Sequence, residues 1–146
     1  MKKICALLIV LVLMMSVVAI PAVAEYERLN IAINGETVYI PYEYGAVIIV
    51  DNRTMVPVRF VSEFLNFTVY WLESEQMVMF ADATHVAIVF QIGGSTLFID
   101  GRSVVMDVPA MLHDNRSYIP LRFFAEAIGF EVDWNEYTRT VSLDRN

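Results

Sequence analysis

The chain has 146 residues, of which 57% are hydrophobic and 18% are charged, and its formal net charge is −7. This length is typical of a single domain with a sizeable core. The acidic balance argues against nucleic acid and anionic membrane surfaces as partners, because phosphate contacts require clustered lysine and arginine. The single cysteine, Cys5, excludes an intrachain disulfide.

The first 24 residues have the pattern of a secretory signal peptide. Two lysines open the segment, an apolar run follows, and residues 22–24 (Ala-Val-Ala) match a signal cleavage site. Because of this site we expect cleavage after Ala24. The alternative is an uncleaved membrane anchor, since the apolar run is near the short limit for spanning a bilayer. The remaining residues 25–146 would number 122 and carry a charge of −9, from 8 arginines and 17 acidic residues. Since they include no cysteine, the core alone must hold the fold.

In chain order, the first elements predicted after this segment are two hairpins. Residues 34–35 (Asn-Gly) favour a tight turn between two strands, and residues 41–45 (Pro-Tyr-Glu-Tyr-Gly) form a loop. Residues 51–52 (Asp-Asn) predict the second turn, followed by a short strand over 54–56. Pro57 then ends the strand and sets φ for the first turn of a helix.

The predicted helix is short and amphipathic, and it should stop near Asn66, because asparagine tolerates the left-handed conformation of a helix cap. Its apolar face, which we expect to be buried, is formed by Phe60, Val61, Phe64 and Leu65. Strands are predicted over residues 67–71 and 77–80. In the second of these strands, Met77 and Met79 share a face, which we expect to lie in the core rather than to bind copper through thioethers.

The second half of the chain predicts the same order of elements. Strands over residues 85–92 and 95–99 lead to a turn at 100–101 (Asp-Gly), and a turn at 114–115 (Asp-Asn) precedes a strand over 117–119. The remaining elements are a helix between Pro120 and Gly129 and strands over residues 130–134 and 140–143.

The two halves are near-copies at a constant offset of 63 residues. Ten of the 21 positions from 51 to 71 are identical to those from 114 to 134, which indicates an internal duplication. We interpret the repeated residues as structural: Asn52, Arg53, Pro57, Arg59, Phe60, Glu63 and Trp71 in copy one, and Asn115, Arg116, Pro120, Arg122, Phe123, Glu126, Gly129 and Trp134 in copy two.

The predicted fold class is therefore α+β, internally duplicated, with a mostly antiparallel β-sheet and two short helices. Copy one spans about residues 29–82 and copy two about residues 85–144. Each half by itself would be marginally stable, so we expect residues 25–146 to form a single cooperative domain.

The phrases NRTMVPVRF (52–60) and NRSYIPLRF (115–123), each followed by a short helix and a Val-x-Trp strand, resemble the copper amine oxidase N-terminal-like domain, also called the stalk domain. The resemblance covers roughly residues 29–144, and copy two matches more closely, through Gly129 and the Arg-Thr-Val of residues 139–141. It implies a sheet curled about helices, found in secreted and envelope proteins of bacteria. In the oxidase, this stalk is remote from the copper and the cofactor, so the resemblance implies no activity.

The chemistry-bearing residues favour the same conclusion. The oxidase holds copper through several histidines in a separate domain, whereas this chain has only His85 and His113. Ser117 lies near His113 in sequence, but copy one has Thr54 and Val50 at the equivalent positions, so we interpret both as turn residues rather than parts of a catalytic triad. We predict no catalytic residue, no metal ligand and no cofactor.

The repeated arginines have two interpretations. Arg59 and Arg122 each have a glutamate four residues later, and we expect each pair to meet on its helix. Arg53 and Arg116 are predicted to tie helix to sheet through carboxylates or carbonyls, in preference to forming an anion-binding patch.

These patterns predict a secreted, non-catalytic, envelope-associated module that binds or spaces an extracellular protein or a cell-wall polymer. Tyr39, Tyr42 and Tyr44 cluster near the loop of copy one and are the predicted contact residues, because tyrosine suits interfaces. We expect no nucleic-acid partner and no stable membrane insertion after signal cleavage. Two alternatives remain: a structural or assembly subunit of the cell envelope that self-associates through exposed sheet edges, and an extracellular hydrolase.

Overall fold

The computed structural model describes residues 29–64, 66–83 and 86–145. The predicted signal peptide and His85 lie outside the described residues. None of the helices in these ranges has the length and hydrophobicity of a membrane-spanning segment.

A central sheet joins the two halves of the chain. Its strands, in spatial order, are β10 (Met111–His113), β11 (Arg116–Pro120), β4 (Arg53–Pro57) and β3 (Ile48–Val50), and all neighbours are antiparallel. In the middle pair, Val56 lies opposite Ile119, the residue 63 positions later in the sequence. The equivalent strands of the two halves, β4 and β11, therefore pair with each other, with Val56 and Ile119 at the centre of the pairing.

The four predicted two-residue turns are confirmed by their backbone angles. At each turn both central residues have φ between 46° and 81°, the left-handed region that the type I′ hairpin requires. Asparagine, aspartate and glycine tolerate this region better than other residues do, which is why the turns occur where the sequence places these pairs.

The predicted strand-to-helix corners are also present. Pro57 and Pro120 are the last residues of their strands, and a helix begins directly after each of them. The helices are α2 (Val58–Phe64) and α3 (Leu121–Ala127). Asn66 and Gly129 follow the helices with φ of 58° and 88°, as expected for residues that end a helix in the left-handed conformation.

The predicted buried face of α2 is partly wrong. Phe60 and Val61 are buried, but Phe64 is 43% exposed and stacks on Phe60 with ring centroids 6.5 Å apart. The inner stripe is instead centred on Val58, Val61 and Ser62, which are spaced three and four residues apart and share one face. Phe64 therefore lies at the flank of the helix, and Leu65 is outside the described residues.

Two outer sheets complete the fold. The meander sheet contains β5 (Thr68–Leu72), β6 (Met77–Ala81), β7 (Val86–Gln91), β8 (Thr96–Ile99) and β9 (Arg102–Val105), antiparallel and in chain order. The terminal sheet contains β12 (Glu131–Asn135), β13 (Thr140–Asp144), β1 (Asn30–Ile33) and β2 (Glu36–Val38). Only β1 and β13 are parallel among these described pairs, so the predicted α+β class with mostly antiparallel strands is confirmed.

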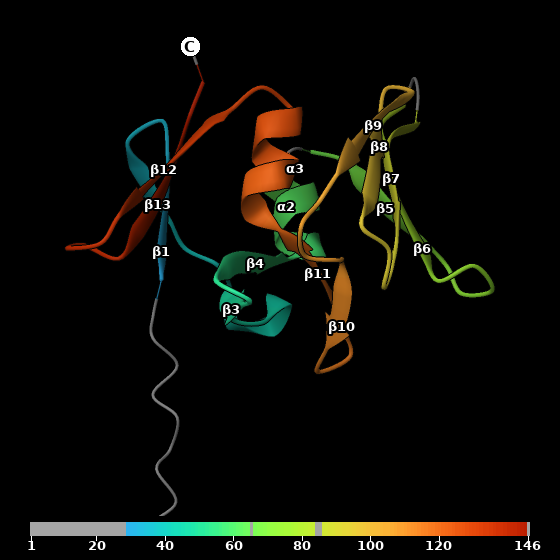
Figure 1. The fold of residues 1–146 in the computed structure, drawn as a ribbon, viewed down its shortest axis with the longest axis horizontal. Helices are drawn as coiled ribbons and strands as arrows, with labels where there is room; N and C mark the ends of the chain where they lie inside the picture. The colour runs from blue at the N-terminus through green and yellow to red at the C-terminus, as the bar shows by residue number, and fades with distance from the viewer. Residues whose placement is uncertain (1–28, 65, 84–85, 146) are drawn as a thin grey trace, which may run out of the picture.

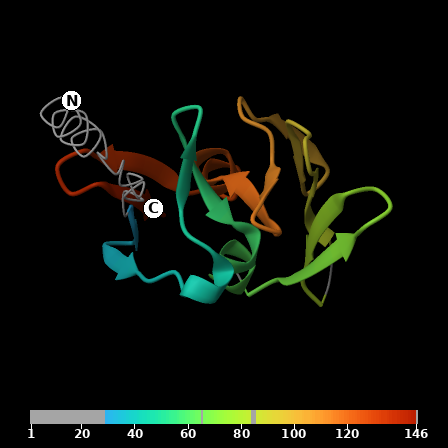
Figure 2. The ribbon, with the colours of Figure 1, turned by 90° about the horizontal axis from the view of Figure 1, so that it is seen from below.

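The helices lie between the two outer sheets, with the central sheet beneath them (Figure 1). The view from below shows the central strands flanked by the terminal sheet on one side and the meander sheet on the other (Figure 2). The first hairpin of the chain, β1–β2, lies beside the last strand, β13, rather than beside the strands of its own half.

The expected burial of Met77 and Met79 is wrong. In β6 the side chains of Val78 and Phe80 are buried, whereas both methionines are only partly buried on the opposite face. The alternation of side chains along β6 was predicted, but which face is buried depends on the side of the sheet that packs against α3. On that side the ring centroids of Phe80 and Phe124 are 5.7 Å apart.

One large apolar cluster includes residues from both halves, both helices and all three sheets. A smaller cluster on the opposite face of the central sheet contains Ile48, Met55, Val108 and Tyr118. The central sheet is thus covered on both faces, because Met55 and Val56 point to opposite sides of β4.

Candidate functional site

The arginines that begin β4 and β11 reach across to loops of the other half. Arg53 forms an ion pair with Asp107, with its Nε donating to Oδ2 at 2.8 Å. Arg116 donates from Nε to the carbonyl oxygen of Glu43 at 3.3 Å, in the single-turn helix η1 (Tyr42–Tyr44). These arginines tie hairpin turns to loops, not helix to sheet, because they lie at the end of the strand remote from the helix.

The predicted pairing of Arg59 and Arg122 with the glutamates four residues later is wrong. Within the described residues, neither guanidinium has a hydrogen bond or an ion pair, and both side chains are exposed. Glu63 instead accepts a hydrogen bond from the hydroxyl of Tyr44 at 2.6 Å. An exposed ion pair between Arg59 and Glu63 would contribute little, because two flexible side chains would have to be held in place. The hydrogen bond from Tyr44 in η1 is the more favourable contact for Glu63.

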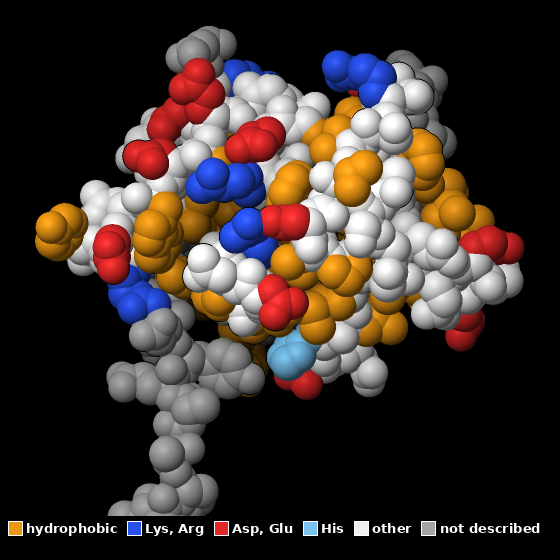
Figure 3. Space-filling model, viewed as in Figure 1, with side chains coloured by type: hydrophobic (Ala, Val, Ile, Leu, Met, Phe, Trp, Pro, Cys, Tyr) orange, Lys and Arg blue, Asp and Glu red, His pale blue; other side chains and the backbone are white. Residues whose placement is uncertain are grey.

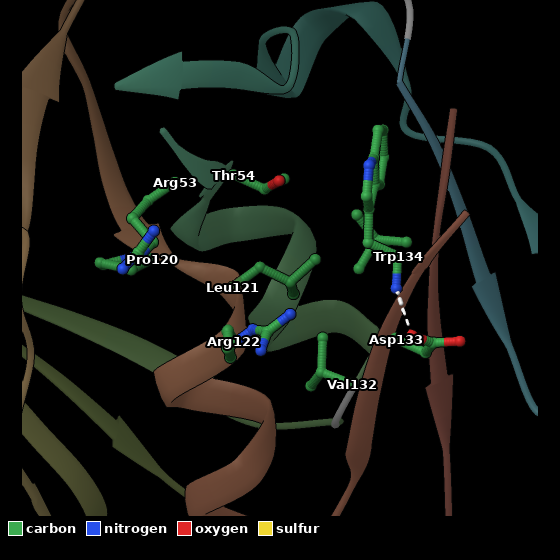
Figure 4. Close-up of a pocket in the computed structure, with 9 residues that line it drawn as sticks. Arg53, Thr54, Pro120, Leu121, Arg122, Val132, Asp133 and Trp134 are labelled. Carbon is green, nitrogen blue, oxygen red and sulfur yellow. Dashed lines mark hydrogen bonds between the residues drawn. The ribbon is translucent and has the colours of Figure 1, made fainter. Parts of the chain in front are cut away.

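A groove, here called the Trp134 groove, opens between the corner at Pro120 and the strand β12 (Figure 4). Its volume is about 160 Å³. The lining residues are Arg53, Thr54, Pro120, Leu121, Arg122, Val132, Asp133, Trp134 and Val141. Figure 4 shows the ring of Trp134 on one side and Arg53 and Thr54 on the other, with Leu121 and then Arg122 below them.

A second groove, here called the Trp71 groove, has matching residues from the other half. Eight of its lining residues lie 63 positions from a residue of the Trp134 groove: Pro57, Val58, Arg59, Val69, Trp71, Val78, Arg116 and Ser117. Each groove therefore combines the first arginine of one central strand with the corner arginine and the tryptophan of the other half. Its volume is about 720 Å³, larger than that of the Trp134 groove.

The two grooves differ at their rims. Asp133 lines the Trp134 groove, whereas Tyr70, at the equivalent position, is not among the residues that line the Trp71 groove. The Trp71 groove is bordered by η1, which is held by the bond from Tyr44 to Glu63 and by the contact of Arg116 with Glu43. The loop at residues 41–45 thus borders only the Trp71 groove.

The charges of the grooves also differ. Two arginines line the Trp134 groove, one of which is already paired with Asp107, and the side chain of Asp133 points away from them on the other side of β12 (Figure 4). Three acidic residues, Glu43, Glu63 and Asp114, line the Trp71 groove. The hydrogen bond to Glu63, followed by burial and the charge of Glu63, raises the pKa of Tyr44 above its usual 10.0. Basic and acidic side chains also alternate with apolar ones across the face in Figure 3.

Comparison with known proteins identifies the family. A family model described as the copper amine oxidase N-terminal domain matches residues 32–143. The chain belongs to this family. In copper amine oxidases this N-terminal domain is non-catalytic. A search of curated proteins finds no match to the chain.

In this copper amine oxidase N-terminal domain, the three tyrosines predicted to contact a partner occupy different environments. Tyr42 is 88% exposed and Tyr39 is also largely exposed, so both are accessible from solvent. Tyr44 is half-buried and its hydroxyl is bound to Glu63, so its contact is internal. Whether Tyr39 and Tyr42 bind a partner remains a prediction.

The described histidine of the domain has local contacts. The ring of His113 lies edge-to-face with Tyr118, with centroids 5.8 Å apart, and its Nε2 is 3.5 Å from Asp114 Oδ2. His113 lines neither groove, although Ser117 lines the Trp71 groove. Among the described residues, no three of His, Cys, Asp and Glu are grouped so that they could hold a metal ion.

Sequence reasoning did not find the grooves of this domain. The repeat indicates only a structural role for Arg122 and Trp134, and no motif assigns a role to Asp133. The Val-Asp-Trp alternation of residues 132–134 places Asp133 and Trp134 on opposite faces of an ideal strand, so no pattern predicted that both line one groove. Arg53 joins them only because β4 pairs with β11.

Proposed function

We propose that this domain is a secreted, non-catalytic module of the cell envelope that binds or spaces an extracellular partner. Membership of a family whose domain is non-catalytic in copper amine oxidases is the observation that carries this function. The signal-like pattern of residues 1–24 supports export, and the acidic charge of the chain suits a soluble extracellular protein.

Fractionation of a bacterial host that expresses the full coding sequence tests the export. We expect the protein in the medium or the wall fraction, beginning at Glu25 by mass spectrometry. The control variant Ala24→Phe should accumulate with residues 1–24 attached, because the cleavage site requires a small residue at this position. Wild-type protein that stays in the cytoplasm with its first 24 residues would contradict export.

Retention on isolated cell-wall material and on extracellular proteins tests the binding. We expect the purified protein to be retained by at least one of these fractions and to be displaced by an excess of the same soluble material. A lack of retention on every fraction would contradict the binding function and leave only a spacer.

We also infer that the chain is internally duplicated and that its two grooves are two versions of one ancestral site. The ten identities between the halves, the equal lengths of α2 and α3 and the matching residues of the grooves support this history. After a duplication, one copy of a site can diverge while the other is retained.

A self-associating subunit is the second candidate function. The strand β9 forms an edge of the meander sheet, and its last residue, Val105, is 72% exposed. An apolar side chain on an open edge favours pairing with another chain. Light scattering would then give a mass that grows with concentration, and Val105→Lys would reduce this growth. A constant mass of one chain would contradict this function.

A further inference from the structure

We propose that the outer face of the meander sheet binds a second copy of this chain, so that two meander sheets pack face to face. This outer face is the side of β5–β9 that is turned away from the helices (Figures 1 and 2). The inference rests on the self-association given above as the second candidate function, and it moves the contact from the edge strand to the face of the sheet.

An unbroken row of apolar side chains crosses the outer face. The row is formed by direct strand partners on the four neighbouring strands β5 to β8, namely Tyr70, Met79, Val89 and Phe98. The residues on either side of Met79, Val89 and Phe98 along their strands are buried, so the row itself lies on the outer side. Tyr70 is 51% exposed and Phe98 is 49% exposed.

The outer face is also uncharged. The only charged residue within β5–β9 is Arg102, whose strand partner is the buried Ile99, so Arg102 belongs to the inner side. Leu72 and Met77 extend the apolar surface along β5 and β6, and Val105 ends β9 on the same side with 72% exposure. Contiguous apolar patches of this kind on soluble proteins mark contact sites.

The terminal sheet shows that the fold does not require an apolar outer face. Its strands β12 and β13 lie 63 residues after β5 and β6, and their outward-facing side chains are polar or charged. Asp133 takes the place of Tyr70, and Ser142 takes the place of Met79. Antiparallel sheets with one face in water normally have this alternation. The apolar residues of the meander sheet therefore indicate a face that another surface covers.

The charge and shape of the outer face favour a second copy as the occupant. Each copy carries a charge of −7, so two copies repel one another over most of their surfaces. Repulsion is smallest at the uncharged outer face, whereas a basic partner would bind the acidic surface elsewhere. Two identical sheets also have the same twist, which aligned packing of one sheet on another requires.

The size of the outer face predicts a weak, closed dimer. Five strands about 4.8 Å apart and about 17 Å long cover about 300 Å² in projection. Side-chain relief adds to this area, but the contact stays below the roughly 800 Å² per partner of a stable interface. We therefore expect a dissociation constant on the order of 10–100 µM. Once two outer faces are packed, neither copy has another to offer, so association stops at two chains.

Sedimentation velocity of the protein purified after expression of its full coding sequence measures this association. We expect the average mass to rise with concentration and to level off at the mass of two chains. Met79→Lys should weaken the dimer about tenfold or more, because it buries a charge at the centre of the packed faces. A lysine makes the chain less negative, so greater overall repulsion cannot cause this loss.

Ser142→Lys is the matched control for Met79→Lys. Both residues are partly buried and face outward on the second strand of their hairpins, and both changes add one positive charge. Ser142→Lys should change the dissociation constant less than about twofold. Phe98→Ala removes a ring without adding a charge, and it should weaken the dimer about threefold or more. Circular dichroism and urea midpoints establish that each variant is folded.

A mass of one chain at every concentration would overturn both this contact and the self-association candidate. Association that Met79→Lys and Phe98→Ala leave unchanged, while Val105→Lys reduces it, would overturn the outer face and leave pairing through the edge of β9. Equal losses in Met79→Lys and Ser142→Lys would also overturn the outer face.

Two further measurements address the other possible occupants. A protein that stays monomeric but sediments with phosphatidylcholine vesicles would overturn the second copy in favour of a lipid surface. A monomer whose retention on extracellular proteins is lost in Met79→Lys would overturn it in favour of a different protein. Failure of the wild type to be retained on cell-wall material or extracellular proteins would contradict the binding function alone.

Discussion

The side chain of Tyr44 links η1 to α2 through its hydrogen bond to Glu63. The raised pKa of Tyr44 means that the folded protein holds this proton more tightly than the unfolded chain. The stabilisation from the link is therefore complete below the ordinary tyrosine pKa of 10.0 and is lost as the pH rises through the higher folded pKa. Ionisation would place a tyrosinate beside the carboxylate of Glu63.

Comparison of the wild type with Tyr44→Phe by urea unfolding tests this linkage. We expect the wild type to be more stable at neutral pH and the difference to shrink as the pH rises above 10.0. Because the other tyrosines titrate in both proteins, their contribution cancels in the difference between the two free energies of unfolding. A stability difference that does not change with pH would contradict the assigned role of the Tyr44 proton.

Each of the helices α2 and α3 is followed by a residue with a left-handed backbone conformation. Gly129 has φ of +88°, and a Cβ there would meet nothing within 4 Å, so substitution costs backbone strain alone. Gly129→Ala should destabilise the domain by about 1 kcal/mol in urea unfolding. Gly129→Asn copies the residue that ends α2, and it should cost about half as much, because asparagine accepts this conformation. Equal costs for the two variants would contradict a purely conformational origin.

At the scale of the whole molecule, the halves are interlocked. The hairpin β1–β2 from the start of the described chain pairs with β13 near its end, and β4 pairs with β11 in the central sheet. The large apolar cluster draws on both halves. Neither half would retain its sheet neighbours by itself, so we expect one unfolding transition.

The two tryptophans report on this cooperativity, because Trp71 lies in the meander sheet and Trp134 in the terminal sheet. Trp71→Phe and Trp134→Phe should each show one urea transition by fluorescence, and each should coincide with the transition of the same variant by circular dichroism. Fluorescence midpoints that depart from circular dichroism in opposite directions would indicate two lobes that unfold separately.

The local structure was largely predictable from particular residues. The pairs Asn34-Gly35 and Asp100-Gly101 predict their hairpins, and Pro57 and Pro120 predict the corners, because these residues restrict or extend the backbone angles of their own positions. Which face of each strand or helix is buried was less predictable. Met77 and Phe64 are apolar, and only the packing of β6 and α2 on their neighbours decides that both are partly exposed.

The turns, the corners and the order of elements follow from the residues at those positions, since each depends on the conformational preferences of neighbouring residues. That β1 lies beside β13, and that Arg53, Arg122 and Trp134 line one groove, depends instead on the packing of the whole chain. These contacts join residues that are far apart in the chain. They depend on how the two halves bury a common core, which no local pattern encodes.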